Sequence, residues 1–134
     1  MLFNRKAELN VMINLAVIDR MMDQKEVNLI KMIGKANEIT EEEVDELIRH
    51  PQTVTNLRLM TEDERFEHLY YLILLMKADG RVIREEIAFC EKIALRLGYE
   101  KDVIGALSQH IYSDPEIQSD RKMLRAKFDR YRIR

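Results

Sequence analysis

Six carboxylates gather in two short stretches of the chain that lie sixty residues apart. They are Asp19, Asp23 and Glu26 in the first stretch and Asp79, Glu85 and Glu86 in the second. Carboxylate oxygens are the ligands that a hard divalent cation such as calcium or magnesium prefers. If the fold brings the two stretches together, four or more carboxylates could bind such an ion, which would offset their mutual repulsion. The same side chains could instead cap helices, because carboxylates near a helix N-terminus accept hydrogen bonds from its free N–H groups.

The sequence excludes an EF-hand calcium site at these stretches. Asp79-Gly80 with Glu86 is similar to the second half of an EF-hand loop, since placing Gly80 at the sixth position puts Glu86 at the twelfth. The first and third positions then fall on Leu75 and Lys77, which offer no carboxylate oxygen. The corresponding positions of the first stretch are equally unsuited, so any cation site there must have another geometry.

The chain contains no recognisable catalytic constellation. Cys90, the only cysteine, falls on an apolar helical stripe, where we expect a core residue rather than a nucleophile. The three histidines fall on separate predicted helices, so no pair of them has the spacing of metal ligands on one helix face. The sequence also has no glycine-rich loop of the kind that holds phosphate groups. We therefore expect a protein that is not an enzyme.

The last fourteen residues form a second candidate site because they are strongly basic. Residues 121–134 hold seven Lys and Arg against one Asp, a balance of +6, so residues 1–120 carry −8 within a net charge of −2. Asp114-Pro115 is a typical helix start, and it predicts a helix over 115–134. The apolar residues of that helix share one face: Ile117, Leu124, Phe128 and Tyr131. The basic residues that we select as candidates for binding a partner are Arg121, Lys122, Arg125, Lys127 and Arg130.

Two interpretations of this basic helix remain open. Its apolar face could dock on the acidic body, with the cations solvated or paired, and residues 132–134 should then fray. Alternatively, the helix binds an anionic partner, either an acidic protein, an anionic membrane surface or RNA. No known nucleic-acid motif supports RNA, so a protein partner or a second copy of the chain is the stronger expectation.

Helices must position both candidate sites. The chain has 134 residues, 46% of them hydrophobic and 34% charged, with only four Gly and two Pro, which is typical of one globular helical domain. Capping sequences and apolar spacings predict helices that begin near residues 4, 24, 41, 62, 84, 101 and 115. The helix that begins near residue 62 is the most apolar and should be the most buried. No apolar run approaches the roughly 20 residues of a transmembrane helix, and a single cysteine allows no internal disulfide, so we expect a cytoplasmic protein.

The chain also matches itself when it is shifted by sixty residues. Asp19 then falls on Asp79 and Glu26 falls on Glu86. Apolar positions match in the same register, among them Ile13 with Ile73, Val27 with Ile87 and Ile33 with Ile93. The register predicts two related halves, residues 5–50 and 62–112, each made of three helices.

The segment from Ala78 to Ile87, Ala-Asp-Gly-Arg-Val-Ile-Arg-Glu-Glu-Ile, followed by the helical residues 91–98, resembles the TerB-like family. That family includes the tellurite-resistance protein TerB and a domain at the N-terminus of some membrane-anchored DnaJ-type co-chaperones. Its signature is an apolar helix that ends in Ala-Asp-Gly, a short acidic turn, and a helix that opens with paired glutamates. The resemblance covers about residues 5–110. Here Arg20 stands where the family has Gly, and Ile83 stands where a capping Ser, Asp or Asn is usual.

The resemblance implies an all-α bundle of two pseudo-symmetric halves, and it implies divalent-metal binding as a family property. Together with the residue patterns, it predicts a single domain over 1–134 with about seven helices, the last of them basic. The function that we expect is a non-enzymatic interaction or scaffold module, linked by the resemblance to a tellurite-type stress response. The alternative is a divalent-metal-binding domain that uses the carboxylates of the two stretches.

Overall fold

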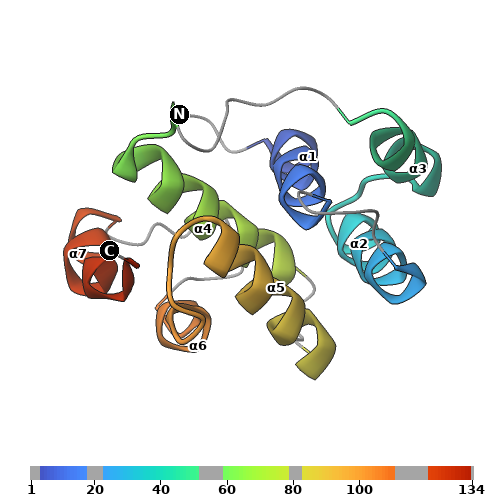
Figure 1. The fold of residues 1–134 in the computed structure, drawn as a ribbon. Coiled ribbons are helices and arrows are strands. Elements are labelled where there is room, and N and C mark those ends of the chain that lie inside the picture. Colours follow the sequence, from blue (N-terminus) through green and yellow to red (C-terminus); the bar gives the residue numbers. More distant parts are fainter. Residues whose placement is uncertain (1–3, 18–22, 52–58, 79–82, 111–120, 134) are drawn as a thin grey trace.

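The computed structural model describes residues 4–17, 23–51, 59–78, 83–110 and 121–133 (Figure 1). Its elements are α1 (Arg5–Ala16), α2 (Gln24–Ala36), α3 (Glu41–Arg49), α4 (Glu62–Met76), α5 (Arg84–Arg96), α6 (Val103–Ser108), α7 (Arg121–Phe128) and a final 3-10 turn, η2 (Asp129–Tyr131). Across these ranges, extended pairing is limited to one isolated bridge between Tyr99 and Arg132. The predicted all-α multihelical fold is therefore confirmed. None of the helices in these ranges has the length and apolar character needed to cross a bilayer.

Side-chain caps set where several helices begin, as the sequence predicts. Asn4 accepts a hydrogen bond from the first turn of α1 at 2.9 Å. Thr40 and Thr61 each open a complete capping box, in which the carboxylates of Glu43 and Glu64 accept a hydrogen bond from the backbone N–H of the threonine. That backbone hydrogen bond is the main reason why the pKa values of Glu43 and Glu64 lie below the ordinary glutamate value. Local cap chemistry thus fixes the start of the first helix in each half of the repeat and of α3.

Helix α4 is the centre of the hydrophobic core. Its residues are buried without interruption from Leu69 to Met76, and nine of its side chains are buried, more than in any other described helix. It packs along α1 and also contacts α2 and α5 (Figure 1). The prediction that this helix is the most buried one is confirmed.

The helices recur in the order that the sixty-residue register predicts. Helices α1, α2 and α3 correspond to α4, α5 and α6. The two first helices, α1 and α4, pack on each other, and each of them also contacts the second helix of the other half. The halves therefore interlock around α1 and α4 instead of forming separate units.

The turn after the second helix has the same conformation in both halves. Glu38 and Gly98 are sixty residues apart, and their φ angles are +63° and +93°. The next residue in each turn donates a backbone hydrogen bond to the residue five positions earlier, Ile39 to Gly34 and Tyr99 to Ala94, both at 2.9 Å. Such helix stops favour glycine because a left-handed backbone strains other side chains. The second half meets this preference, whereas the first half places a glutamate there.

The second helix of each half also closes the C-terminal end of the first helix of the other half. Asn37 donates a side-chain hydrogen bond to the carbonyl oxygen of Leu75 in α4 at 3.0 Å. Arg96 donates to the carbonyl oxygens of Leu15 and Ala16 in α1, the latter at 2.7 Å. Since Leu15 and Leu75 are equivalent in the repeat, two different side chains perform one pseudo-symmetric task. Both satisfy carbonyl groups that a helix end leaves without a partner inside the helix.

Two sequence predictions about the helices need correction, and a third lies outside the described residues. The apolar spacing of the helix that begins near residue 84 favours a core position for Ile87, which is instead 37% exposed. Glu86 takes the buried position in the first turn of α5, where its carboxylate accepts a hydrogen bond from the backbone N–H of Ile83. Helix α6 covers only Val103–Ser108 rather than 101–112. Residues 111–120, with the predicted helix start at 114–115, lie outside the described ranges.

Candidate functional site

Two of the candidate metal ligands act as helix caps. Asp23 precedes α2 and accepts a hydrogen bond from the backbone N–H of Glu26 at 2.8 Å. Glu86 is buried in the first turn of α5 and accepts from the backbone N–H of Ile83 at 3.3 Å. Ile83 has no acceptor in its own side chain, so Glu86 supplies the side-chain half of a capping box alone. These two contacts agree with the interpretation that the acidic stretches cap helices.

Glu26 forms an ion pair between the two halves. Asp23 and Glu26 have the three-residue spacing of a capping box, in which Glu26 would accept a hydrogen bond from the backbone N–H of Asp23. The carboxylate of Glu26 instead lies 2.6 Å from the ammonium group of Lys92 in α5. A charged partner offers a stronger hydrogen bond than a backbone amide, which explains the difference. Met32 stands at the position equivalent to Lys92, so the second half cannot repeat this ion pair.

The shared cation site remains a hypothesis. Asp19 and Asp79 lie outside the described ranges, and Glu85 is exposed. Among the residues that the structure describes, no group of three or more His, Cys, Asp or Glu side chains could hold a metal ion. A site that used the acidic stretches would therefore have to draw on Asp19 and Asp79 in addition to carboxylates that already cap or pair.

Calcium gives a direct test of the two interpretations. If the carboxylates only cap helices, millimolar calcium or magnesium should leave the melting temperature unchanged, because a ligand stabilises only by binding the folded state. The measurement is thermal unfolding followed by circular dichroism, with EDTA as the reference condition. A rise of the melting temperature with calcium that disappears in Asp79→Asn would contradict the capping interpretation.

A largely buried side-chain hydrogen bond that sequence reasoning missed joins the two central helices. Glu8 in α1 is 6% exposed, and its carboxylate lies 3.0 Å from Nδ1 of His68 in α4. The two residues are sixty positions apart and are therefore equivalent in the repeat, as expected for a contact on the axis that relates the halves. The repeat register could have revealed this pair. It is a structural contact between α1 and α4.

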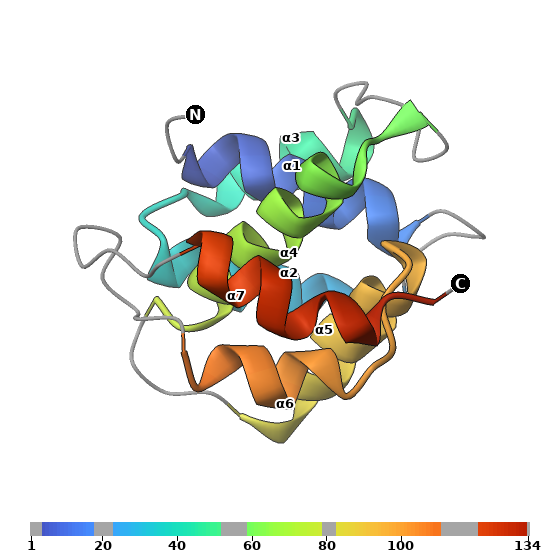
Figure 2. The ribbon, with the colours of Figure 1, turned by 90° about the vertical axis from the view of Figure 1, so that its left-hand side faces the viewer.

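The inner face of α7 docks on the body. Leu124 and Phe128 are 3% and 2% exposed. Arg125 forms ion pairs with Glu62 and Asp63, in the acidic first turn of α4. Figure 2 shows α7 on the outside of the bundle beside α6, which it contacts. The docked interpretation of this helix is therefore correct for its apolar face and for Arg125.

The chain beyond α7 is held in place by backbone hydrogen bonds. The N–H of Glu100 donates to the carbonyl of Tyr131 at 2.7 Å, and the N–H of Ile133 donates to the carbonyl of Gly98 at 2.9 Å. Between them, Arg132 donates from its side chain to the carbonyl of Gly98 at 3.1 Å. The expectation that the end of the chain frays is wrong for residues 132 and 133, because these contacts tie it to the turn after α5. Arg134 lies outside the described ranges.

Three cations project from the opposite side of α7. Lys122 and Lys127 of α7 and Arg130 of the turn η2 that follows it are exposed, and we call these three residues the outer face of α7. The ammonium group of Lys127 lies 5.6 Å from the centre of the Phe128 ring, and the guanidinium group of Arg130 lies 5.4 Å from that of Tyr131. No carboxylate in the described part of the chain forms an ion pair with these three residues. The side chain of Arg121, the fifth candidate, lies outside what the structure describes.

No family model, curated protein or solved structure matches this chain. The resemblance to the TerB-like family rests on the motif at 78–87, and residues 79–82 of that motif lie outside the described ranges. The described geometry favours the surface of α7 as the candidate site. Arg125 pairs there with carboxylates of the body, whereas the three residues of the outer face have no such pair among the described residues. Cys90 offers no alternative chemistry, because its burial raises the pKa of the thiol to about 12. It is a core residue, as the sequence predicts.

Proposed function

We propose that this chain is a non-catalytic interaction module that binds an acidic protein through the outer face of α7. The observation that supports this most directly is that the cations of the C-terminal helix and turn fall into two groups, one paired with the body and one not. Arg125 is occupied by carboxylates of the body, whereas Lys122, Lys127 and Arg130 have none in the described residues. A helix that served only to cover the core would not need this second basic face.

The docked side of α7 gives the outer face a fixed geometry. Leu124 and Phe128 anchor the helix from within, and Arg125 at its edge pairs with Glu62 and Asp63 of the body. The rings of Phe128 and Tyr131 lie close to the charged groups of Lys127 and Arg130. Charges that are held in position before binding lose less conformational entropy when a partner arrives. This arrangement suits recognition of a carboxylate-bearing surface.

An acidic protein fits this surface better than a membrane or RNA. Residues 1–120 carry a charge of −8, so a large anionic surface would attract α7 and repel the body at the same time. A protein partner can place a few carboxylates against the outer face without approaching the rest. Under the same proposal, the TerB-like resemblance would make this module part of a stress response.

The test measures the binding of a fluorescein-labelled, glutamate-rich helical peptide to the full-length chain by fluorescence anisotropy. The variant K122E/K127E/R130E should bind at least about tenfold more weakly, because each lost ion pair at an exposed site contributes up to about 1 kcal/mol. Salt should weaken binding to the unmodified chain, since exposed charges are screened over about 10 Å at 0.1 M.

The matched control is K25E/R84E/K101E, which alters three exposed cations elsewhere and changes the net charge by the same amount. It should bind the peptide as the unmodified chain does. Arg125 is left unchanged in both variants, because reversing it would place like charges beside Glu62 and Asp63 and destabilise the docking of α7. Equal losses in the two variants would show that only net charge matters. Binding to anionic vesicles or single-stranded RNA, with none to the peptide, would contradict a protein partner.

A further inference from the structure

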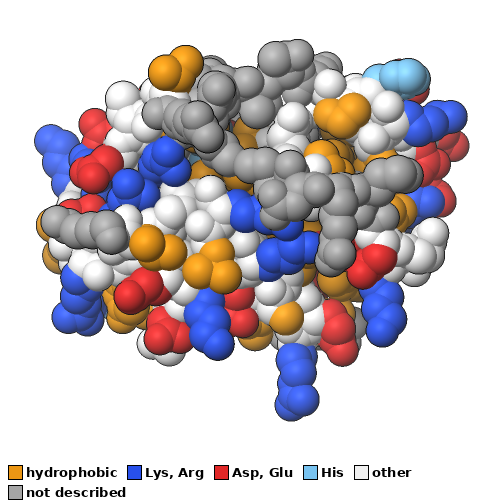
Figure 3. Space-filling model, viewed as in Figure 1, with side chains coloured by type: hydrophobic (Ala, Val, Ile, Leu, Met, Phe, Trp, Pro, Cys, Tyr) orange, Lys and Arg blue, Asp and Glu red, His pale blue; other side chains and the backbone are white. Residues whose placement is uncertain are grey.

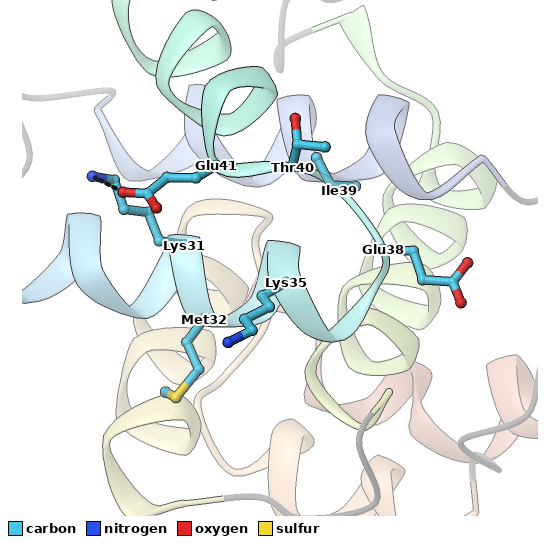
Figure 4. A pocket seen from close by; sticks show the side chains of 7 residues that line it. All are labelled: Lys31, Met32, Lys35, Glu38, Ile39, Thr40 and Glu41. Carbon is cyan, nitrogen blue, oxygen red and sulfur yellow. Dashed lines mark hydrogen bonds and ion pairs between the residues drawn. The ribbon is translucent and has the colours of Figure 1, made fainter.

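Helix α3 carries a surface that complements the outer face of α7. Val44 and Leu47 face the core, and the opposite side of the helix is acidic. We call that side the acidic face of α3; its residues are Glu41, Glu42, Asp45 and Glu46. Two cations approach it. Lys31 pairs with Glu41 (Figure 4) and also with Asp45, and Arg49 lies 3.8 Å from Glu46. Four carboxylates against two cations leave the face negative, with Glu42 outside these pairs.

The two charged faces lie on opposite sides of the molecule. Figure 1 shows α3 at one end of the bundle and α7 at the other, with α1 and α4 between them. The outer face of α7 therefore cannot pair with the acidic face of α3 in the same chain. On the side that Figure 3 shows, acidic and basic side chains are interspersed, so the visible side chains there do not form a competing patch of one sign. Complementary faces at opposite ends favour a head-to-tail contact between copies.

An apolar contact is available beside each charged face. A groove of about 620 Å³ lies between α2 and α3. Met32 and Ile39 supply its apolar lining, and the rest is polar or charged: Lys31, Lys35, Glu38, Thr40 and Glu41 (Figure 4). Met32 is 40% exposed. On α7, Met123 is 61% exposed among the cations of the outer face. A methionine side chain is flexible and fits irregular apolar gaps, so Met123 could enter the groove of a second copy.

We propose that the acidic partner of α7 is the acidic face of α3 in a second copy of this chain, which gives head-to-tail self-association. This inference rests on the proposed function, because it names the partner of the same basic surface. Exposed ion pairs are individually weak, so the association should be reversible and should be lost at high salt. A heterologous contact of this kind forms chains or closed rings rather than symmetric dimers.

Sedimentation velocity of the full-length chain tests this, at about 20 mM and about 500 mM sodium chloride. The unmodified chain should sediment as concentration-dependent oligomers at low salt and as a monomer at high salt. The variant K122E/K127E/R130E and the variant E42K/E46K should each remain monomeric, since both of their charged faces then have the same sign. An equimolar mixture of the two should associate again, because the reversed α7 of one meets the reversed α3 of the other.

The variant K25E/R84E/K101E has the same net charge as the α7 variant and should still associate. Circular dichroism establishes that each variant is folded, and E42Q/E46Q replaces E42K/E46K if the latter does not fold. A monomeric unmodified chain at low salt, or association that persists in both reversed variants, would overturn the inference. The glutamate-rich peptide binds the same surface but does not need a second copy, so peptide binding by a strictly monomeric chain would reject the second copy and keep the proposed function.

Discussion

Replacing Phe128 by alanine should lower the free energy of unfolding by about 3–5 kcal/mol, the usual cost of removing a buried phenylalanine. Phe128 is 2% exposed. Its ring lies 5.5 Å from the ring of His110 and stacks at 5.7 Å on Tyr131, so it joins α7 to the end of α6 and to η2. Its loss would leave a cavity at the point where the C-terminal elements meet the body. Urea unfolding followed by circular dichroism measures the change.

Met123→Ala is the matched control, because Met123 lies on the outward side of the same helix and is 61% exposed. A surface truncation of this kind should change stability by no more than about 0.5 kcal/mol. The slope of the unfolding free energy against urea adds a second readout. If Phe128→Ala releases α7 from a body that stays folded, less surface remains to be exposed on unfolding and the slope should fall. Equal effects of the two substitutions would mean that α7 is not docked through Phe128.

The sequence predicts helix starts well because the responsible contacts are local. The caps at Asn4, Thr40 and Thr61 each join residues three positions apart, so the residue types and their spacing contain the whole interaction. The repeat register is a second reliable signal. It predicts the order of the helices, and the equivalent turns at Glu38 and Gly98 follow it.

Contacts between distant parts of the chain could not be predicted in the same way. Glu26 and Lys92 are 66 positions apart, and nothing near Glu26 in the sequence indicates that it prefers Lys92 to its own cap. The end of the chain was expected to fray because terminal residues usually lack partners. Arg132 in fact reaches the carbonyl of Gly98, 34 positions away. Only the packed arrangement of α5 and η2 provides that partner.

The candidate site also combines a feature that local sequence predicts with contacts that it does not. Apolar spacing predicted that α7 has one buried face, and Leu124 and Phe128 confirm it. The sequence could not show which cations are occupied, because that depends on where the first turn of α4 lies. Glu62 and Asp63 are adjacent in the sequence and were visible as a helix start, but their contact with Arg125 spans more than sixty positions. These ion pairs engage Arg125 within the chain, and its selection as a partner-binding residue stays a prediction.

Replacing Gly98 by alanine should destabilise the protein by about 2–4 kcal/mol, from backbone strain and from disturbed hydrogen bonds of an arginine. The backbone of Gly98 has a φ of +93°, which L-amino-acid side chains rarely adopt. A Cβ atom at this position would also lie 2.6 Å from Nη1 of Arg132 and 3.5 Å from Nη1 of Arg65. Arg132 would have to leave the carbonyl groups of Leu97 and Gly98, which it bonds at 3.3 and 3.1 Å.

Two control substitutions separate these causes by urea unfolding. Gly105→Ala introduces the same methyl group into α6, where no atom lies within 4 Å, and should stabilise the protein by up to about 1 kcal/mol through helix propensity. Glu38→Gly makes the equivalent turn of the first half resemble the second, and it should not destabilise the protein, because glycine relieves the strain of a φ of +63°. Gly98→Ala and Glu38→Gly thus change the same position of the repeat. We expect the first to lower the free energy of unfolding and the second not to lower it. If Gly98→Ala were as harmless as Gly105→Ala, the turn after α5 would not need glycine, and the close approach of Arg132 would not hold the end of the chain.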